Sequence, residues 1–243
     1  MTTKKLPKKI KNCPIVEAIV ELRFESLLPR DAVFGVIYDK FKTDFSSEPK
    51  SLPILQIPET MRSQDPNLIF KPHYQLIDER FIFQIGPKVV SFSIKDDYVG
   101  WSAFSSRIKI YFDKIKELKI VNKSQRLGLR YINFFNNINI FDKIKLEMVL
   151  DKKPLASKNL YIKTTIESNG FLNTLQVSND AMLQRSNIPT KGSIIDIDTY
   201  CEKDGKEIIE NIDDLLEKGH IEEKFLFYDL PTPEFLKELD PIY

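Results

Sequence analysis

Cys13-Pro14-Ile15-Val16-Glu17-Ala18-Ile19-Val20-Glu21-Leu22-Arg23-Phe24 is the stretch that decides the fold class. It is rich in β-branched and apolar residues, and its proline stands at the entrance, where a missing N–H costs least, so the stretch predicts a strand. A similar line runs from Gln125 to Phe134, and the two lines share a Leu-Arg-aromatic tripeptide, Leu22-Arg23-Phe24 and Leu129-Arg130-Tyr131. Each is followed by a short helical piece, a meander of strands and a long amphipathic helix. The sequence therefore predicts two similar halves that share one core.

The first half carries one helix, a meander and a long helix after its opening strand. Apolar residues recur at helical spacing from Val33 to Phe45, and residues 46–67 are irregular, with a short edge strand at 54–57. Strands are predicted over 68–76, 80–85 and 88–94, the last two forming a hairpin around Gly86-Pro87. A long helix begins near residue 98, and Trp101 opens its apolar stripe, so we expect this side chain to be buried.

The second half repeats this order. After a strand over 125–135 and a turn or short helix over 136–144, strands are predicted at 145–150, 160–167, 171–177 and 193–200. Ser168-Asn169-Gly170 is a strong hairpin signal. Residues 205–229 predict a second long helix that Gly219 loosens, and a short helix over 234–239 closes the chain. The dense apolar residues from Leu226 to Tyr243 predict that this C-terminal segment folds back on the protein, with an interface to a partner as the alternative.

These elements predict an α+β protein: antiparallel sheets built from two similar β-α-β(3-4)-α halves, with long helices packed on the sheet. The predicted organisation is a flexible basic tail over 1–12 and a single globular unit over 13–243. Within that unit, a pseudo-duplication relates residues 13–122 to 123–243.

Composition excludes several classes of protein. The net charge is +1, so no overall field favours nucleic acid or a membrane surface. No apolar run approaches the length of a bilayer span, and two cysteines cannot make a disulfide framework. We therefore expect a cytoplasmic protein that does not bind membranes. Nucleic acid is not the expected partner either: aromatic and basic residues interleave at 130–135, but no RNA-recognition signature accompanies them.

Motifs of the common catalytic and cofactor sites are absent from the sequence. It contains no Walker loop, G-x-G-x-x-G, H-E-x-x-H, C-x-x-C or G-x-S-x-G pattern. His73 and His220 are the only histidines, and nothing in their spacing to Cys13, Cys201 or a serine favours a nucleophile and base. We expect structural histidines, no catalytic residue, no cofactor and no bound metal.

Four charged residues are the candidates for ligand binding: Arg23, Arg130, Asp196 and Asp198. The two aspartates lie two apart on a predicted strand, so both project from one face and could hold a divalent cation. The interpretation we favour is that they form the wet face of a strand whose dry face is Ile195 and Ile197. The two arginines could point into one cleft, or pair with acids such as Glu21 and Asp196; we favour ion pairs.

Four segments resemble a sporadically distributed, functionally uncharacterised bacterial family of about this length. They are the opening 14–24, Tyr98-Val99-Gly100-Trp101-Ser102-Ala103-Phe104, Gly128-Leu129-Arg130-Tyr131-Ile132-Asn133 and Asp196-Ile197-Asp198. The resemblance covers nearly the whole chain and implies no catalytic residue, cofactor or substrate. The scattered occurrence of the family resembles that of horizontally transferred genes, including toxin–antitoxin and phage-defence loci.

The hypothesis we favour is a non-catalytic binding or interaction protein that recognises a protein partner or a small ligand, with a homodimer as one arrangement. The first alternative is a metal-dependent enzyme acting on a phosphate ester or nucleic acid. It would use Asp196 and Asp198 as ligands and Arg130 or Arg23 to stabilise charge. The second alternative is an intracellular carrier of an apolar small molecule, held between the aromatic-rich strands and the helices.

Overall fold

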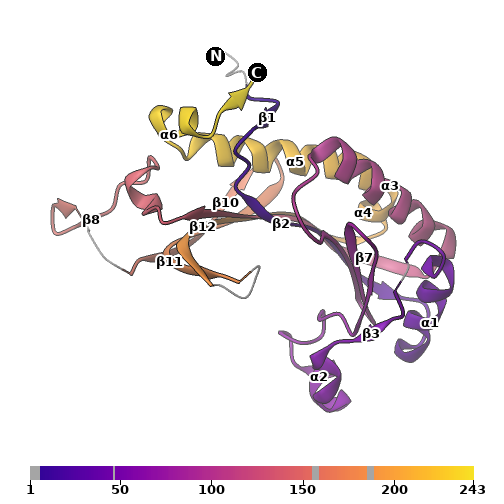
Figure 1. Cartoon of the computed structure of the whole chain (residues 1–243). Coiled ribbons are helices and arrows are strands. Elements are labelled where there is room, and N and C mark those ends of the chain that lie inside the picture. Colours follow the sequence, from indigo (N-terminus) through magenta and orange to yellow (C-terminus); the bar gives the residue numbers. More distant parts are fainter. Residues whose placement is uncertain (1–5, 46, 155–158, 185–188) are drawn as a thin grey trace. The chain divides into compact units, whose positions relative to one another are not determined.

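The structure is a computed structural model of the 243-residue chain and describes residues 6–45, 47–154, 159–184 and 189–243. It confirms an α+β protein with antiparallel strands and helices packed on them (Figure 1). The chain forms two compact units. Unit 1 comprises residues 1–16, 130–199 and 220–243, and unit 2 comprises residues 17–129 and 200–219. Strands β2, β7 and β12 and helix α5 each contribute residues to both units.

Unit 2 contains the opening strand and the first meander. Its elements, including those shared with unit 1, are β2 (Ile15–Ser26), α1 (Arg30–Phe41), β3 (Lys50–Ser51), η1 (Pro53–Gln56), α2 (Glu59–Gln64), β4 (Tyr74–Ile77), β5 (Phe81–Gly86), β6 (Val89–Ile94), α3 (Trp101–Leu118), β7 (Val121–Asn136), β12 (Thr190–Gly205), α4 (Glu207–Glu210) and α5 (Ile212–Asp229).

The register of the antiparallel pairs gives the sheet of unit 2 one apolar face. Leu22 of β2 lies opposite Val90 of β6, and Phe92 of β6 lies opposite Phe83 of β5. Side chains of directly opposite residues share a face, so these apolar residues line one side, and their neighbours in sequence line the other. The predicted hairpin is confirmed: β5 and β6 are joined at Pro87 and Lys88.

The core of unit 2 is a cluster of aromatic rings around Tyr111 of α3. The ring centroid of Tyr111 lies 4.8 Å from that of Phe92 and 5.6 Å from that of Phe41 on α1. Phe83 and Phe92 stack at 4.3 Å, and these four rings have no exposed surface. The phenol of Tyr111 is not left unpaired, because Arg107 Nε donates a hydrogen bond to it over 2.8 Å. Burial raises the pKa of Tyr111 to about 12. The apolar stripe of α3 therefore packs on the sheet, as predicted.

Unit 1 contains the second meander and both ends of the described chain. Its remaining elements are β1 (Lys9–Ile10), η2 (Ile140–Asp142), β8 (Val149–Leu150), β9 (Lys153–Pro154), β10 (Tyr161–Ser168), β11 (Phe171–Leu183), α6 (Pro233–Glu238) and β13 (Pro241–Ile242). The predicted hairpin is confirmed: β10 pairs with β11, and Ser168 lies opposite Phe171 across Asn169-Gly170, both of which have positive φ.

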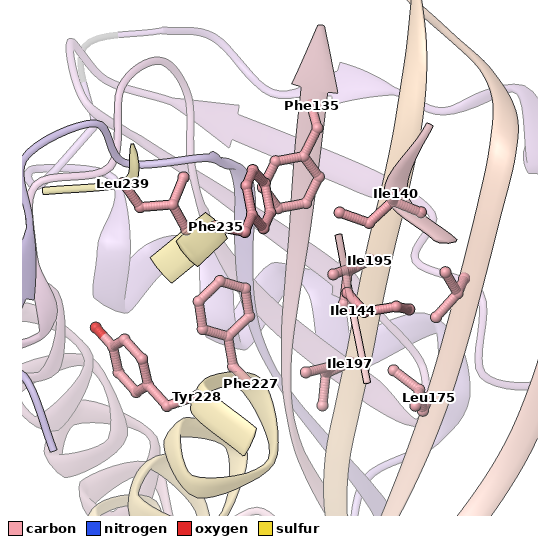
Figure 2. Close-up of a cluster of buried hydrophobic side chains, with 11 residues drawn as sticks. Phe135, Ile140, Ile144, Leu175, Ile195, Ile197, Phe227, Tyr228, Phe235 and Leu239 are labelled. Carbon is pink, nitrogen blue, oxygen red and sulfur yellow. The ribbon is translucent and has the colours of Figure 1, made fainter. Parts of the chain in front are cut away.

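The core of unit 1 joins its strands to the C-terminal helices (Figure 2). Ile195 and Ile197 of β12 are fully buried and lie in one cluster with Phe227 and Tyr228 of α5. Phe235 of α6 belongs to the same cluster, and its ring centroid lies 5.5 Å from that of Phe135 of β7. The C-terminal segment therefore folds back into the core of unit 1, which confirms that prediction.

The two ends of the described chain are also paired with each other. Strands β1 and β13 are antiparallel, with Lys9 opposite Ile242, and Lys8 N donates to Ile242 O over 2.6 Å. Asn12 N donates to Leu239 O. Of the tail predicted over 1–12, residues 8–12 thus carry backbone hydrogen bonds to the C-terminal segment, and residues 1–5 lie outside the described residues; the flexibility of the tail stays a prediction.

Several predicted elements differ in position or type. The edge strand expected at 54–57 is the 3₁₀ helix η1, because Pro53 at its first position presets a helical φ; β3 precedes it. The strand expected over 68–76 starts only at Tyr74, and that expected over 145–150 only at Val149. The second long helix is interrupted at Asn211, between α4 and α5, and Gly219 lies inside α5.

Trp101 is not fully buried, contrary to expectation. It is the first residue of α3, and its side chain is partly exposed. Its indole Nε1 donates a hydrogen bond to Glu217 Oε2 over 2.8 Å, and Lys109 Nζ reaches the other oxygen of that carboxylate, also over 2.8 Å. The indole N–H needs a hydrogen-bond acceptor. At the end of the apolar stripe, Trp101 can reach the Glu217 carboxylate.

The boundaries of the two units differ from the predicted halves. The predicted division lies between residues 122 and 123. In the structure, the chain passes from one unit to the other after residues 16, 129, 199 and 219. The pseudo-duplication stays a prediction. Among the helices of the described residues, none is both long and apolar enough to cross a bilayer.

Candidate functional site

The face of the unit 2 sheet opposite the aromatic core carries charged residues. Leu22 and Phe24 of β2 point into the core and are fully buried, so Glu21 and Arg23 point to the other face. Glu21 lies opposite Ser91 of β6. The tripeptide that characterises the opening strand therefore places its two apolar side chains in the core and its arginine on the polar face.

Glu21 holds two arginines on this face. Its Oε1 accepts hydrogen bonds from Arg23 Nε over 2.7 Å and from Arg126 Nη1 of β7 over 2.9 Å. Arg23 is two residues along the same strand, and Arg126 comes from a different strand. The ion pair expected between Arg23 and Glu21 is confirmed, and the second arginine makes it a triad.

Arg126 is held tightly by its surroundings. It is 7% exposed, and its guanidinium lies over the ring of Tyr200 at 4.3 Å from the centroid. On another side it lies against Gly128, where an added Cβ would be 2.3 Å from Arg126 Nη1. Glycine at 128 is therefore required for this placement of the guanidinium, because any side chain would collide with it.

A pocket of about 390 Å³ opens beside this triad. We call it the arginine pocket; it is lined by Arg23, Phe70, Gln125, Arg126, Glu202, Lys203 and Asp204. The Arg23 guanidinium lies over the Phe70 ring, 5.0 Å from the centroid. Only Nε of Arg23 has a hydrogen-bond partner within the described part of the chain, so its two terminal nitrogens are not used there. The pocket thus combines hydrogen-bond donors with an aromatic wall.

Two acceptors line the same pocket. Gln125 Nε2 donates to Glu25 at the long distance of 3.5 Å, whereas its Oε1 is buried and has no hydrogen-bond partner in the described part of the chain. The carboxylate of Glu202 makes no ion pair or hydrogen bond to any residue that the structure describes. Buried polar atoms ordinarily have partners, so an orphaned oxygen in a pocket wall indicates a place for a ligand donor or a water.

The other predicted arginine, Arg130, has a different environment in unit 1. Its Nε and Nη2 bind the two oxygens of Asp196 of β12, over 2.8 and 2.6 Å. Asp196 Oδ2 also accepts a hydrogen bond from Gln176 Nε2 over 3.0 Å, and Gln176 Oε1 accepts one from Tyr161 over 2.6 Å. A chain of polar contacts therefore crosses four strands. The expected ion pair of Arg130 with Asp196 is confirmed, and it is bidentate.

This network limits what Asp196 and Asp198 can do together. Asp196 is 6% exposed and already accepts three hydrogen bonds, so a cation would have to displace Arg130 or Gln176 from it. Asp198 is half-buried and engaged in interactions of its own. Among the described residues, no three or more His, Cys, Asp or Glu side chains form a group able to hold a metal ion.

The two histidines lie in different units. His220 Nδ1 is 3.4 Å from the Tyr131 hydroxyl in unit 1. In unit 2, Arg62 Nη1 is 3.3 and 3.2 Å from the two ring nitrogens of His73. Burial and the nearby arginines lower the pKa of His73 to about 4, so this imidazole is neutral at pH 7. Of the two cysteines, Cys13 is exposed and Cys201 is buried, and burial raises the pKa of the Cys201 thiol.

Sequence reasoning identified Arg23 and Glu21 but missed Arg126, Phe70 and Gln125 as members of the site. Arg126 is one of several basic residues between 107 and 126, and nothing local distinguishes it from a solvated lysine. A usable signal was its position two residues before Gly128, since a glycine within a strand often marks the close approach of another group.

No family model matches the chain, and no curated protein matches it significantly.

Proposed function

We propose that this chain is a non-catalytic binding protein and that the arginine pocket of unit 2 holds its ligand, either a small molecule or a segment of a protein partner. One observation carries the proposal. Arg23 is fixed by Glu21 at Nε and by Phe70 at its face, while its terminal nitrogens have no partner among the described residues. A guanidinium fixed in this way loses little side-chain entropy when it binds, which favours recognition.

The lining of the pocket specifies the chemistry of the ligand. The terminal nitrogens of Arg23 suit a carboxylate or phosphate group, which accepts two parallel hydrogen bonds. Gln125 Oε1 and Glu202 supply acceptors, so the same ligand should carry a hydrogen-bond donor such as an ammonium or amide group. Phe70 offers an apolar surface for its remaining part. Amino acids, peptide ends and nucleotides meet these requirements.

The test is a ligand-detected NMR screen of a panel of amino acids, dipeptides and mononucleotides. Arg23→Gln should weaken the binding of any hit by about ten- to a hundredfold, because a hydrogen bond to a charged group contributes ~1.5–3 kcal/mol. Arg80→Gln is the matched control, since Arg80 is exposed and lies outside the pocket. Hits that bind Arg23→Gln as well as the unaltered chain would contradict the assignment of the pocket.

The metal-dependent enzyme and the apolar carrier remain alternative predictions. The first requires Asp196 to exchange Arg130 or Gln176 for a cation. Calorimetric titration with Mg²⁺ or Mn²⁺ tests it: saturable heat that disappears in Asp196→Asn with Asp198→Asn would favour that alternative over the binding protein.

A further inference from the structure

A second pocket of unit 2, with a volume of about 210 Å³, gathers three basic side chains from three segments of the chain. Arg30 is the first residue of α1, Arg62 belongs to α2, and His73 immediately precedes β4. We call it the histidine pocket; it is lined by Arg30, Asp31, Phe34, Leu55, Glu59, Arg62, His73, Tyr74, Ile85, Gly86 and Pro87. It shares no lining residue with the arginine pocket.

Arg30 has an unmet donor in this pocket. Its Nε is buried and has no hydrogen-bond partner among the residues that the structure describes. The closest carboxylate contact recorded for it is Glu59 Oε1 at 3.7 Å, which is too long for a hydrogen bond. The Glu59 side chain is 56% exposed. Leaving a buried donor unpaired costs free energy, which an acceptor entering the pocket would recover.

Arg62 and His73 present further donors. Arg62 is positioned by Nε, which donates to Ile57 O over 2.8 Å, so the guanidinium is fixed against the imidazole of His73. Within the described residues, the imidazole has no acidic partner in hydrogen-bonding contact, and its close neighbour is a cation. Three basic groups that converge without a carboxylate hydrogen-bonded to any of them are suited to a polyvalent oxyanion.

We propose that the histidine pocket binds the phosphate group of a small phosphorylated ligand, through the side chains of Arg30, Arg62 and His73. Phosphate offers separate oxygens to each of the three donors, whereas a carboxylate offers two oxygens in one plane. The aromatic rings of Phe34 and Tyr74, whose centroids are 3.9 Å apart, form one wall beside the basic groups and give an organic portion of the ligand a surface to contact.

The binding of phosphate should raise the pKa of His73. In the ligand-free protein, burial and the charges of Arg62 and Arg30 lower the pKa of His73 to about 4, against the opposing charge of Asp31. Asp31, Glu59, Arg30, Arg62 and the phenol of Tyr74 are the charged or titratable groups that line the pocket with it. The negative charge of a bound phosphate group offsets the arginine charges and should therefore raise the pKa of His73.

The experiment is calorimetric titration of the full chain with inorganic phosphate and, separately, with a nucleoside monophosphate, at pH about 8, where the phosphate group is a dianion. Saturable binding is the expected result. Arg30→Gln and His73→Gln should each weaken binding about tenfold or more. Exposed Lys50→Gln is the control and should bind normally.

A second measurement guards against a variant that misfolds. The His73 imidazole proton, distinguished from that of His220 by the His220→Gln variant, should show its pKa rising by a unit or more when phosphate is added, with His220 unchanged. Tighter binding of the nucleotide than of phosphate would assign the source as a nucleotide, and equal binding would assign it as phosphate alone. No saturable heat with either compound at millimolar concentration, or binding that survives Arg30→Gln and His73→Gln, overturns the proposal.

Discussion

Arg23 and Arg130 are each the central residue of a Leu-Arg-aromatic tripeptide, yet their guanidinium groups make different contacts. Arg130 engages both oxygens of Asp196 through two nitrogens, whereas Arg23 uses only Nε toward Glu21. Asp196 lies on another strand, where its carboxylate can meet the fork of the guanidinium. Glu21 lies two residues before Arg23 on the same strand and reaches it from the side. The position of the acid, rather than the tripeptide, decides which arginine keeps donors for a ligand.

The aromatic residue of each tripeptide is buried and contributes to a core. Replacing it with alanine should have the largest effect on stability. Phe24 is fully buried and Tyr131 is 2% exposed, so Phe24→Ala and Tyr131→Ala should each lower the free energy of unfolding by about 3–5 kcal/mol. Denaturant unfolding followed by circular dichroism measures this loss. Leu27→Ala is the control, because Leu27 is 63% exposed and should change stability by less than about 0.5 kcal/mol. A loss below about 1 kcal/mol at either aromatic position would contradict the claim that both aromatic side chains stabilise a core.

The two units also differ in how they treat a buried polar group in the core. In unit 2, the phenol of Tyr111 is paired with Arg107. In unit 1, Glu223 of α5 is 6% exposed and makes no ion pair or hydrogen bond to the described residues. Burial raises the pKa of Glu223 to about 8, with the charge of Lys224 opposing the shift. Unit 1 therefore contains a carboxyl group that is protonated at neutral pH.

Because Glu223 keeps its proton in the folded chain, we predict that the free energy of unfolding falls as the pH rises. The folded chain keeps the Glu223 proton up to pH about 8, whereas the unfolded chain loses it near pH 4.5, so the folded state binds more protons between these values. The free energy of unfolding should then decrease across this window, by at most about 1.4 kcal/mol per pH unit. Glu223→Gln should remove that slope, and exposed Glu210→Gln should retain it. Urea unfolding from pH 5 to 9 measures both, and a slope that survives Glu223→Gln would contradict the assignment.

The sequence predicted which helices and strands form better than it predicted the residues at which they begin and end. Alternation over 88–94 and the Asn169-Gly170 turn are local signals, and both hairpins formed where they were expected. The strands expected over 68–76 and 145–150 begin only at Tyr74 and Val149, where pairing with the next strand begins; Pro72, which lacks a backbone N–H, stands just before the first of them. Trp101 shows the same limit, because helical spacing placed it on the stripe but could not reveal that Glu217, far along the chain, binds its indole.

The candidate site was predictable only in part, for a similar reason. Alternation along β2 placed Arg23 and Glu21 on one face, and their pairing followed from it. The aspartate pair was assigned to a wet strand face, but Asp196 is buried, because Arg130 and Gln176 cover it from neighbouring strands. Arg126 and Phe70 reach the pocket through tertiary contacts that leave no periodic pattern in the sequence.

Gly128 offers a way to disturb one arginine site without changing a charge. An added Cβ would lie 2.3 Å from Arg126 Nη1 and 2.9 Å from its Cζ, so Gly128→Ala must move a guanidinium held by Glu21 and Tyr200. We expect a loss of about 1–3 kcal/mol in the free energy of unfolding and weaker ligand binding in the arginine pocket. Gly35→Ala, inside α1 with no atom within 4 Å of the new Cβ, should instead be neutral or stabilising by up to about 1 kcal/mol. Equal stability of the two variants would show that Arg126 adapts freely.

The smallest expected effects on stability come from replacing the two arginines, and they should differ between Arg130 and Arg23. Arg130→Gln leaves the buried carboxylate of Asp196 with Gln176 as its remaining recorded hydrogen-bond donor, and should lower the free energy of unfolding by about 1–2 kcal/mol. This range is discounted because the Arg130 side chain is 41% exposed. Arg23→Gln leaves Glu21 paired with Arg126, so its cost should stay below about 0.5 kcal/mol. Ligand binding should show the opposite order, with Arg23→Gln defective and Arg130→Gln unaffected. If Arg23→Gln proved the more destabilising of the two, Arg23 would be the structural arginine, and the arginine pocket would lose the donor on which its assignment depends.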